Sequence, residues 1–278
     1  MTKETQSQLA DKFQNMHKEN RIIVLPNAWD AGSAVIFEKE GFSAIATTSA
    51  GISYSLGYPD GEIITFEDVL DTTKKIQKRI SIPLSVDVER GYGNNTSEIV
   101  NNIQTIIEQG VVGINIEDGI LAQKTLSDMN EQCKLISEIS KIKNHLGINF
   151  VINARTDSFW LGTGKTKDEQ LSQTIKRANK YLKAGADCIF VPGLLEVNEI
   201  EMLVQHIKGP VNIITTPSSP SIKELQKLGV ARVSTGSGPV RASFALIKNI
   251  SNELKDEGTY NNIYKTTIAY DKLNYIFK

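Results

Sequence analysis

Short apolar stretches that follow helix-ending glycines are the feature that most constrains the fold of this chain. In four places a helical pattern stops at a glycine and an apolar stretch begins almost at once, as in "EKEGFSAIATTSA" and "LKAGADCIFVPG". Glycine commonly occupies the left-handed position after a helix, so each place reads as a helix running into a strand. The four glycines are Gly41, Gly110, Gly185 and Gly229. The repetition predicts alternating strands and helices.

Eight strands are predicted in all, and a segment with helical periodicity follows each one. Most of them are continuously apolar, which indicates burial on both faces, as in a parallel sheet. Eight such units in a chain of 278 residues favour an α/β fold, a closed (β/α)8 barrel of the TIM type. The alternative is a doubly wound open sheet, but the first strand lacks the dinucleotide-binding glycine motif. The strands are expected near residues 22–25, 43–48, 84–89, 113–117, 150–155, 188–191, 211–215 and 231–235.

We expect one domain, residues 1–278, in which the barrel has an addition at each end. Residues 3–19 read as a polar helix that precedes the first strand. Residues 257–278 read as a helical tail whose apolar residues are spaced nearly as a stripe. Such a stripe is typical of core or of a subunit contact.

Composition excludes several classes of partner. With a formal net charge of -1, the chain has no broad electrostatic field for nucleic acid or for an acidic membrane surface. No apolar run approaches the roughly 18 residues of a membrane span. Cys133 and Cys188 read as free thiols of a reducing compartment. A cytoplasmic protein is predicted.

Charged residues gather where the strands end, which is where barrel enzymes build their active sites. Asp87 and Glu89 close the third strand, Glu117 the fourth and Arg155 the fifth. No lysine or histidine stands at a strand end, which weakens a Schiff-base aldolase or a zinc hydrolase. Oxygen ligands suit Mg2+, with Mn2+ as the alternative. The competing interpretation is an ion-pair network of these acids with Arg90 and Arg155.

The motifs together resemble the isocitrate lyase and phosphoenolpyruvate mutase superfamily. The resemblance covers residues 21 to about 245 and rests on five segments in order. They are "LPNAWDAGSAVIFEKEGFSAIATTSAGISYSLGYPDG", "SVDVERGYGN", "GINIEDG", "INARTDSF" and "AGADCIFVPG". The acidic strand followed by Gly-Tyr-Gly is the most specific element.

The resemblance implies a role for each candidate residue. Asp87 would contact Mg2+, and Glu89 and Glu117 would hold its water ligands. A 2-oxo acid carboxylate would bind Ser49 and the backbone N–H groups of Ala50 and Gly51. Asp60, in "LGYPDG", matches an acid of the family's loop after the second strand, and Arg155 would steady the developing enolate.

The implied activity is that of a Mg2+-dependent lyase that cleaves a C–C bond of a small 2-oxo acid through a metal-bound enolate. Oxaloacetate-type decarboxylation and methylisocitrate-lyase-like cleavage are two such reactions. The chain lacks the Lys-Lys/Arg-Cys-Gly-His motif of the known lyases, and Gly119 replaces a lysine found in the phosphonomutases. A phosphoenolpyruvate or phosphonopyruvate phosphonomutase or hydrolase is one alternative, and a non-catalytic ligand-binding barrel is another. Family members exchange their last barrel helix, so a dimer or tetramer is implied.

Overall fold

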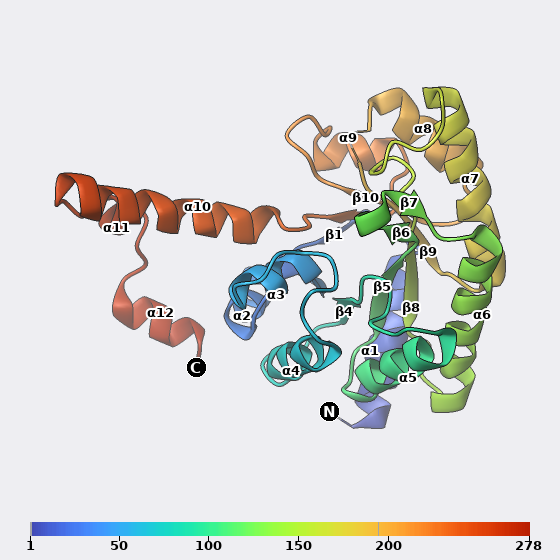
Figure 1. The fold of residues 1–278 in the computed structure, drawn as a ribbon. Coiled ribbons are helices and arrows are strands. Elements are labelled where there is room, and N and C mark those ends of the chain that lie inside the picture. Colours follow the sequence, from blue (N-terminus) through green and yellow to red (C-terminus); the bar gives the residue numbers. More distant parts are fainter. Residues whose placement is uncertain (1, 194) are drawn as a thin grey trace.

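Eight parallel strands close into a barrel because the first one is divided at Pro26 and pairs on both sides (Figure 1). The computed structural model describes residues 2–193 and 195–278. Its β1 (Ile23–Leu25) pairs with β11 (Arg232–Ser234), and β2 (Asn27–Ala28) pairs with β3 (Ile45–Thr47). Proline donates no hydrogen bond, but the Pro26 carbonyl accepts the N–H of Ala46 at 3.0 Å, so pairing continues across the break.

The remaining strands lie where apolarity predicted them, so the barrel prediction is confirmed. Between β11 and β3 the order is β10, β9, β8, β5 and β4. Their bounds are β4 (Leu84–Asp87), β5 (Gly113–Glu117), β8 (Val151–Arg155), β9 (Cys188–Val191) and β10 (Val211–Ile214). A separate antiparallel hairpin, β6 (Gly119–Ile120) and β7 (Thr125–Leu126), encloses a short 3-10 turn, η1 (Leu121–Gln123).

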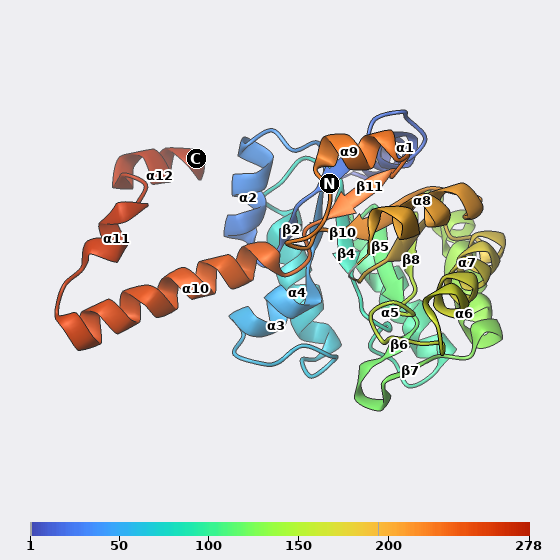
Figure 2. The same ribbon diagram turned by 90° about the horizontal axis from the view of Figure 1, so that it is seen from above.

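Most of the helices alternate with the strands and form the outer layer of the barrel, whereas α1 and α10 to α12 lie outside this layer (Figures 1 and 2). Side-chain caps fix where many of them begin; Asp30, Thr65 and Ser221 each form a capping box. The bounds are α1 (Lys3–Met16), α2 (Ala31–Lys39), α3 (Ser49–Ser55), α4 (Phe66–Gln77), α5 (Thr96–Glu108), α6 (Met129–Leu146), α7 (Lys167–Ala184), α8 (Val197–His206), α9 (Ile222–Lys227), α10 (Gly238–Asn252), α11 (Asn261–Lys265) and α12 (Tyr270–Ile276).

Helix α1 closes the end of the barrel opposite the candidate site. Its Gln6 Nε2 donates to the carbonyls of Ile107 and Val111 at 2.7 and 3.0 Å. Its Phe13 is fully buried, and the buried Arg232 guanidinium lies 5.9 Å from the centre of that ring. The predicted N-terminal helix is therefore part of the folded barrel and covers its end.

The chain leaves the barrel after β11. Helix α10 projects away from it, and a π-helical turn, η2 (Glu253–Glu257), precedes α11 and α12 (Figures 1 and 2). Large apolar residues of α10 are exposed, among them Phe244, Leu246 and Ile247. The chain end returns to α2 and α4, where Arg79 Nη2 donates to the Phe277 carbonyl at 2.7 Å. Among the described residues, no helix is long and apolar enough to cross a membrane.

The subunit contact predicted for residues 257–278 stays a prediction, and the exposed face of α10 supports extending it to that helix. We expect a dimer or tetramer in sedimentation at micromolar concentration, because a single chain leaves these apolar side chains in water. Charged substitutions at Phe244 and Ile247 would then lower the sedimentation coefficient. A wild-type monomer would contradict the prediction.

Another prediction concerns His17, which follows α1 and is buried. Its Nδ1 lies 2.8 Å from the Phe13 carbonyl, and burial, with the Arg232 charge, lowers its pKa to about 3. Between pH 6.5 and about 3 the native state therefore binds fewer protons than the unfolded chain. Stability should fall with decreasing pH, by at most about 1.4 kcal/mol per pH unit.

His17→Gln should flatten that dependence in denaturant titrations at pH 7 and pH 5. The matched control is His206→Gln, because the exposed His206 makes the same Nδ1 contact with the carbonyl four residues before it. Equal pH dependence in wild type and His17→Gln would contradict the assignment.

Candidate active site

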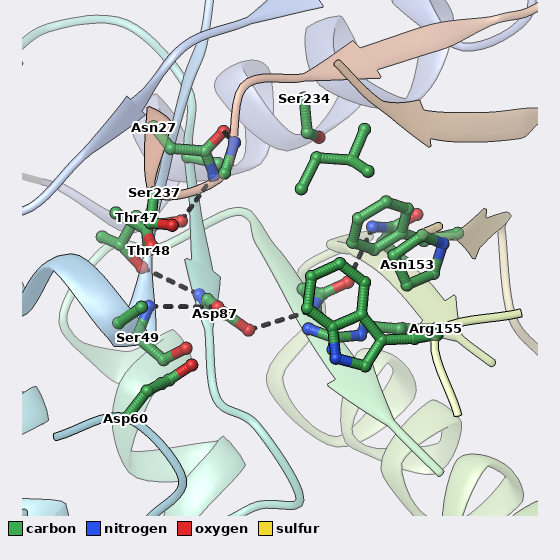
Figure 3. Close-up of a pocket in the computed structure, with 18 of the residues that line it drawn as sticks. Asn27, Thr47, Thr48, Ser49, Asp60, Asp87, Asn153, Arg155, Ser234 and Ser237 are labelled. Carbon is green, nitrogen blue, oxygen red and sulfur yellow. Dashed lines mark hydrogen bonds between the residues drawn. The ribbon is translucent and has the colours of Figure 1, made fainter. Parts of the chain in front are cut away.

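A cavity of about 110 Å³ opens where the strands end, on the face that the sequence predicted. Polar side chains of β2, β3, β4 and β8 line one part of it, and Leu121, Trp160, Phe190, Pro192 and Ile214 line the other. Figure 3 shows Ser49, Asp60, Asp87 and Arg155 around this space. The cavity has room for a small organic acid.

Asp87 ends β4 and is held by neighbours on both sides. Its Oδ2 accepts the backbone N–H of Ser49 at 3.0 Å, and its Oδ1 accepts Asn115 Nδ2 at 2.9 Å (Figure 3). Its own N–H donates to Thr47 Oγ1 at 2.8 Å. Both carboxylate oxygens keep lone pairs that these bonds do not use, so the group remains able to bind a ligand in the cavity.

Ser49 and Ala50 line the cavity from the first turn of α3, as the predicted carboxylate site requires. Gly51 lies behind them: it is buried and does not line the cavity. Its N–H donates to Thr48 Oγ1 at 3.3 Å, the cap of α3. Ser49 and Ala50 are thus the predicted carboxylate-binding residues that face the cavity.

Arg155 is clamped between two buried carboxylates. Its Nη1 lies 2.8 Å from Glu117 Oε2, and its Nε lies 2.7 Å from Asp157 Oδ1. These neighbours hold the pKa of Arg155 above its ordinary value although burial alone would lower it. The guanidinium is thereby fixed at the cavity wall, over Phe190. The ion pair considered from sequence for Glu117 is present; Arg90 makes no ion pair among the described residues.

Glu89 and Glu117 face a second, smaller cavity of about 70 Å³. Leu121 lines both cavities, so the two spaces adjoin. Glu89 Oε1 accepts the Tyr92 hydroxyl, and its Oε2 accepts the N–H of Glu62 at 2.8 Å. The three acids predicted to surround a metal are therefore divided between the two spaces. Among the described residues, no three acidic, His or Cys side chains meet in a ready-made metal site.

Asp60 comes from the loop between α3 and α4, on the cavity side of Ser49 (Figure 3). The residue as a whole is exposed, but its carboxyl group is turned inward. Partial burial of that group and the charge of Asp87 raise its pKa, against opposing contributions from Arg155 and Ser49. A raised pKa near a reactive cavity suits a group that gives or accepts a proton.

Negative charge exceeds positive charge at this end of the barrel. Burial raises the pKa of Glu89 to about 8 and also raises those of Glu117 and Asp157. The charge of Asp87 adds to the increase in all three, and in Asp60. Among the described residues, Arg155 is the only guanidinium that forms an ion pair with these acids. The buried Arg232 also lines the cavity, against Phe13. A divalent cation bound by oxygen ligands would remove the excess, so the donor set fits Mg2+.

Two asparagines support the site and were missed in the sequence. Asn153 Nδ2 donates to Asn115 Oδ1 at 2.9 Å, and Asn115 in turn donates to Asp87. The available signal was an asparagine two positions before a charged strand end, in "INIE" and "INAR". Residues two apart in a strand share a face, so these amides point into the barrel below Glu117 and Arg155.

Asp157 was also missed as a partner of Arg155. Its position depends on Gly119, because a Cβ added there would lie 2.1 Å from Asp157 Oδ2. Its N–H donates to Asp118 Oδ1 at 2.9 Å, and Asp118 accepts the Tyr181 hydroxyl at 2.6 Å. The glycine that replaces the mutase lysine therefore leaves the space that Asp157 occupies.

Comparison with known proteins agrees with this geometry. The phosphoenolpyruvate phosphomutase family model matches residues 13–255. An uncharacterized protein of Mycobacterium tuberculosis is 36% identical over 88% of this chain and 89% of its own length. The 2-methylisocitrate lyase of Halalkalibacterium halodurans is 31% identical over 92% of this chain and 85% of its own length.

Among solved structures, a suspected lyase/mutase from Burkholderia cenocepacia superposes with a TM-score of 0.91 at 29% identity, covering 98% of this chain and 97% of that one. The family match spans the barrel and every candidate site residue. This chain belongs to the phosphoenolpyruvate phosphomutase family, within the isocitrate lyase and phosphoenolpyruvate mutase superfamily of lyases and mutases.

Proposed function

We propose that this protein is a Mg2+-dependent lyase that cleaves a C–C bond of a small 2-oxo acid, as in decarboxylation of an oxaloacetate-type acid or methylisocitrate-type cleavage. The observation that carries the proposal is the excess of carboxylates around Asp87, beside a cavity lined by Ser49, Ala50 and Arg155. The 2-methylisocitrate lyase similar to this chain supports the reaction class.

Asp87 is the residue that would hold Mg2+ directly, with Glu89 and Glu117 holding its water ligands. When bound, the cation would stabilise negative charge on the keto oxygen of the substrate; Mn2+ would serve the same purpose. Ser49 and Ala50 would bind the substrate carboxylate through hydroxyl and backbone N–H groups. The Ser49 N–H also donates to Asp87, so the first turn of α3 would position both the substrate carboxylate and the cation.

Arg155 would stabilise negative charge that develops on the substrate, and Asp60 would transfer a proton. Glu117 and Asp157 fix the Arg155 guanidinium, so its positive charge is already oriented when negative charge develops on the substrate. Asp60 lies beside Ser49, on the side of the cavity opposite Arg155 (Figure 3). Its raised pKa suits transfer of a proton to or from the carbon at which the bond breaks.

Phosphonomutase or phosphonopyruvate hydrolase activity is the second candidate, favoured by the family model that matches the chain. Gly119 argues against it, since a lysine side chain there would overlap Asp157. Phosphorus NMR of phosphonopyruvate incubated with the protein and Mg2+ separates the candidates. Only a phosphonomutase or phosphonopyruvate hydrolase would change the phosphorus signal of phosphonopyruvate.

Oxalate binding tests the role of the cation. Calorimetry should show oxalate, a planar mimic of the pyruvate enolate, binding tightly only with Mg2+. Asp87→Asn should weaken this binding by more than about 100-fold, since 10- to 100-fold losses are typical of residues that merely support a metal ligand. Asn115→Ala, which frees Asp87 Oδ1, should fall within that range.

The control for charge is Asp71→Asn, because Asp71 is an exposed acid paired with Lys75 on α4. Oxalate binding that ignores Mg2+ would contradict the cation role. No binding in either condition would favour a barrel that has lost its chemistry and binds another ligand. Turnover of oxaloacetate-like acids that survives Asp87→Ala would contradict the proposed active site.

A separate variant tests how Glu117 and Asp157 hold Arg155. Gly119→Ala should displace Asp157, because 2.1 Å is well inside van der Waals contact, and should weaken Mg2+-dependent oxalate binding about tenfold. Gly32→Ala is the matched control, since its added Cβ would meet nothing nearer than 3.5 Å. Unchanged oxalate affinity in Gly119→Ala would show that Asp157 does not set the Arg155 position.

A further inference from the structure

One glutamate fastens the loop between α3 and α4 to the turn after β4. The backbone N–H of Glu62 donates to Glu89 Oε2 at 2.8 Å. The Glu62 carboxylate reaches back, and its Oε1 accepts the N–H groups of Arg90 and Tyr92 at 3.0 Å each. We call these four residues, Glu62, Glu89, Arg90 and Tyr92, the latch. Its two halves are reciprocal, since each side supplies a carboxylate to backbone N–H groups of the other.

The turn after β4 is shaped to receive a carboxylate. Glu89, Gly91 and Tyr92 have positive φ angles of 47°, 105° and 55°, a region that is uncommon for residues other than glycine. At Gly91 a Cβ would lie 2.3 Å from Ile99 Cγ2, so a side chain is excluded as well. Turns of this kind aim successive N–H groups into one concavity that binds anions. Here the Glu62 carboxylate occupies it, which gives the Gly-Tyr-Gly motif a role in docking the loop.

Apart from the latch, the loop is held near its start, where the Tyr58 N–H donates to the Ser53 carbonyl at 2.9 Å. Leu56, Tyr58 and Ile63 are exposed, so the loop buries little apolar surface before Ile64. Gly57 and Gly61 flank Asp60 with φ angles of 85° and 105°, so the loop changes direction on either side of that residue. Charge-assisted hydrogen bonds are stronger than neutral ones, and the Glu62 carboxylate accepts a pair of them, two residues from Asp60.

We propose that Glu62 is a positioning residue that keeps Asp60 beside Ser49, and that the latch couples this loop to the candidate cation site through Glu89. Both Glu89 oxygens are engaged, Oε1 by the Tyr92 hydroxyl and Oε2 by Glu62, so a change at Glu89 reaches the loop directly. Coupling between two sites is reciprocal. The coupling to Mg2+ rests on the function proposed above, and the positioning of the loop does not.

Hydrogen–deuterium exchange of the metal-free protein tests the positioning. Glu62→Ala removes the acceptor of the Arg90 and Tyr92 N–H groups, so both should exchange about tenfold faster or more, together with amides of residues 57–64. Glu62→Gln keeps an uncharged acceptor and should fall between wild type and Glu62→Ala. The matched control is Glu67→Ala, because Glu67 is exposed on α4. Unchanged exchange at Arg90 and Tyr92 in Glu62→Ala would overturn the proposal.

The coupling has its own readout. Mg2+ with oxalate should slow exchange of residues 57–64 in wild type and have at least a tenfold smaller effect in Glu62→Ala. Equal slowing in both proteins would overturn the coupling and leave the positioning role intact. If wild type bound no oxalate with Mg2+, the proposed function would fail, while exchange of the metal-free protein would still decide the role of Glu62.

Once a substrate is known, kinetics separate positioning from general destabilisation. Glu62→Ala should lower kcat with little change in KM, because Ser49 and Ala50 do not depend on the latch. In an Asp60→Asn background, Glu62→Ala should cause no further loss, since both changes remove the same function. Additive losses would show that Glu62 does not act through Asp60.

Discussion

Five carboxylates gather at the mouth of the barrel, and among the described residues only Arg155 forms an ion pair with any of them; this imbalance governs the site. Glu89, Glu117 and Asp157 are buried, Asp87 is partly buried, and Asp60 reaches in from an exposed loop. Arg155 pairs directly with two of them. Burying charges of one sign is costly, so the surroundings must supply hydrogen bonds, protons or another cation. Asn115 and the Ser49 N–H donate hydrogen bonds to Asp87, and the Tyr92 hydroxyl donates one to Glu89. The raised pKa of Glu89 indicates that its hydrogen bonds do not fully offset the burial of its charge.

The same imbalance explains why loops far apart in sequence meet at the site. A carboxylate that cannot be neutralised by a side chain attracts backbone N–H groups, and these come from segments that must then lie close. Ser49 at the start of α3 approaches Asp87 in this way, and Glu62 approaches Glu89. Each contact holds a loop that follows a strand, a part of the chain that pairing between strands does not hold in place.

The sequence predicted the barrel because strands buried on both faces are apolar along their whole length, a signal that does not depend on which strand is the neighbour. It also predicted which strand ends carry charge. It did not predict that Glu89 would line a different cavity from Asp87, in a turn where Glu89 itself has a positive φ angle. Nor did it predict that Asp157 would clamp Arg155, which depends on space left by Gly119, 38 positions earlier. Local pattern places residues along strands, whereas pairing inside the site depends on turn geometry and on contacts between distant segments.

The exchange of a lysine for Gly119 changes the charge balance as well as the space. A lysine there would add a cation among these acids, as the phosphonomutase pattern suggests. In this chain the position holds no side chain, and Asp157 adds an acid in the same place. Relative to a site with that lysine, this one lacks a positive charge next to Asp157. The divalent cation proposed above would then carry more of the charge compensation at this site.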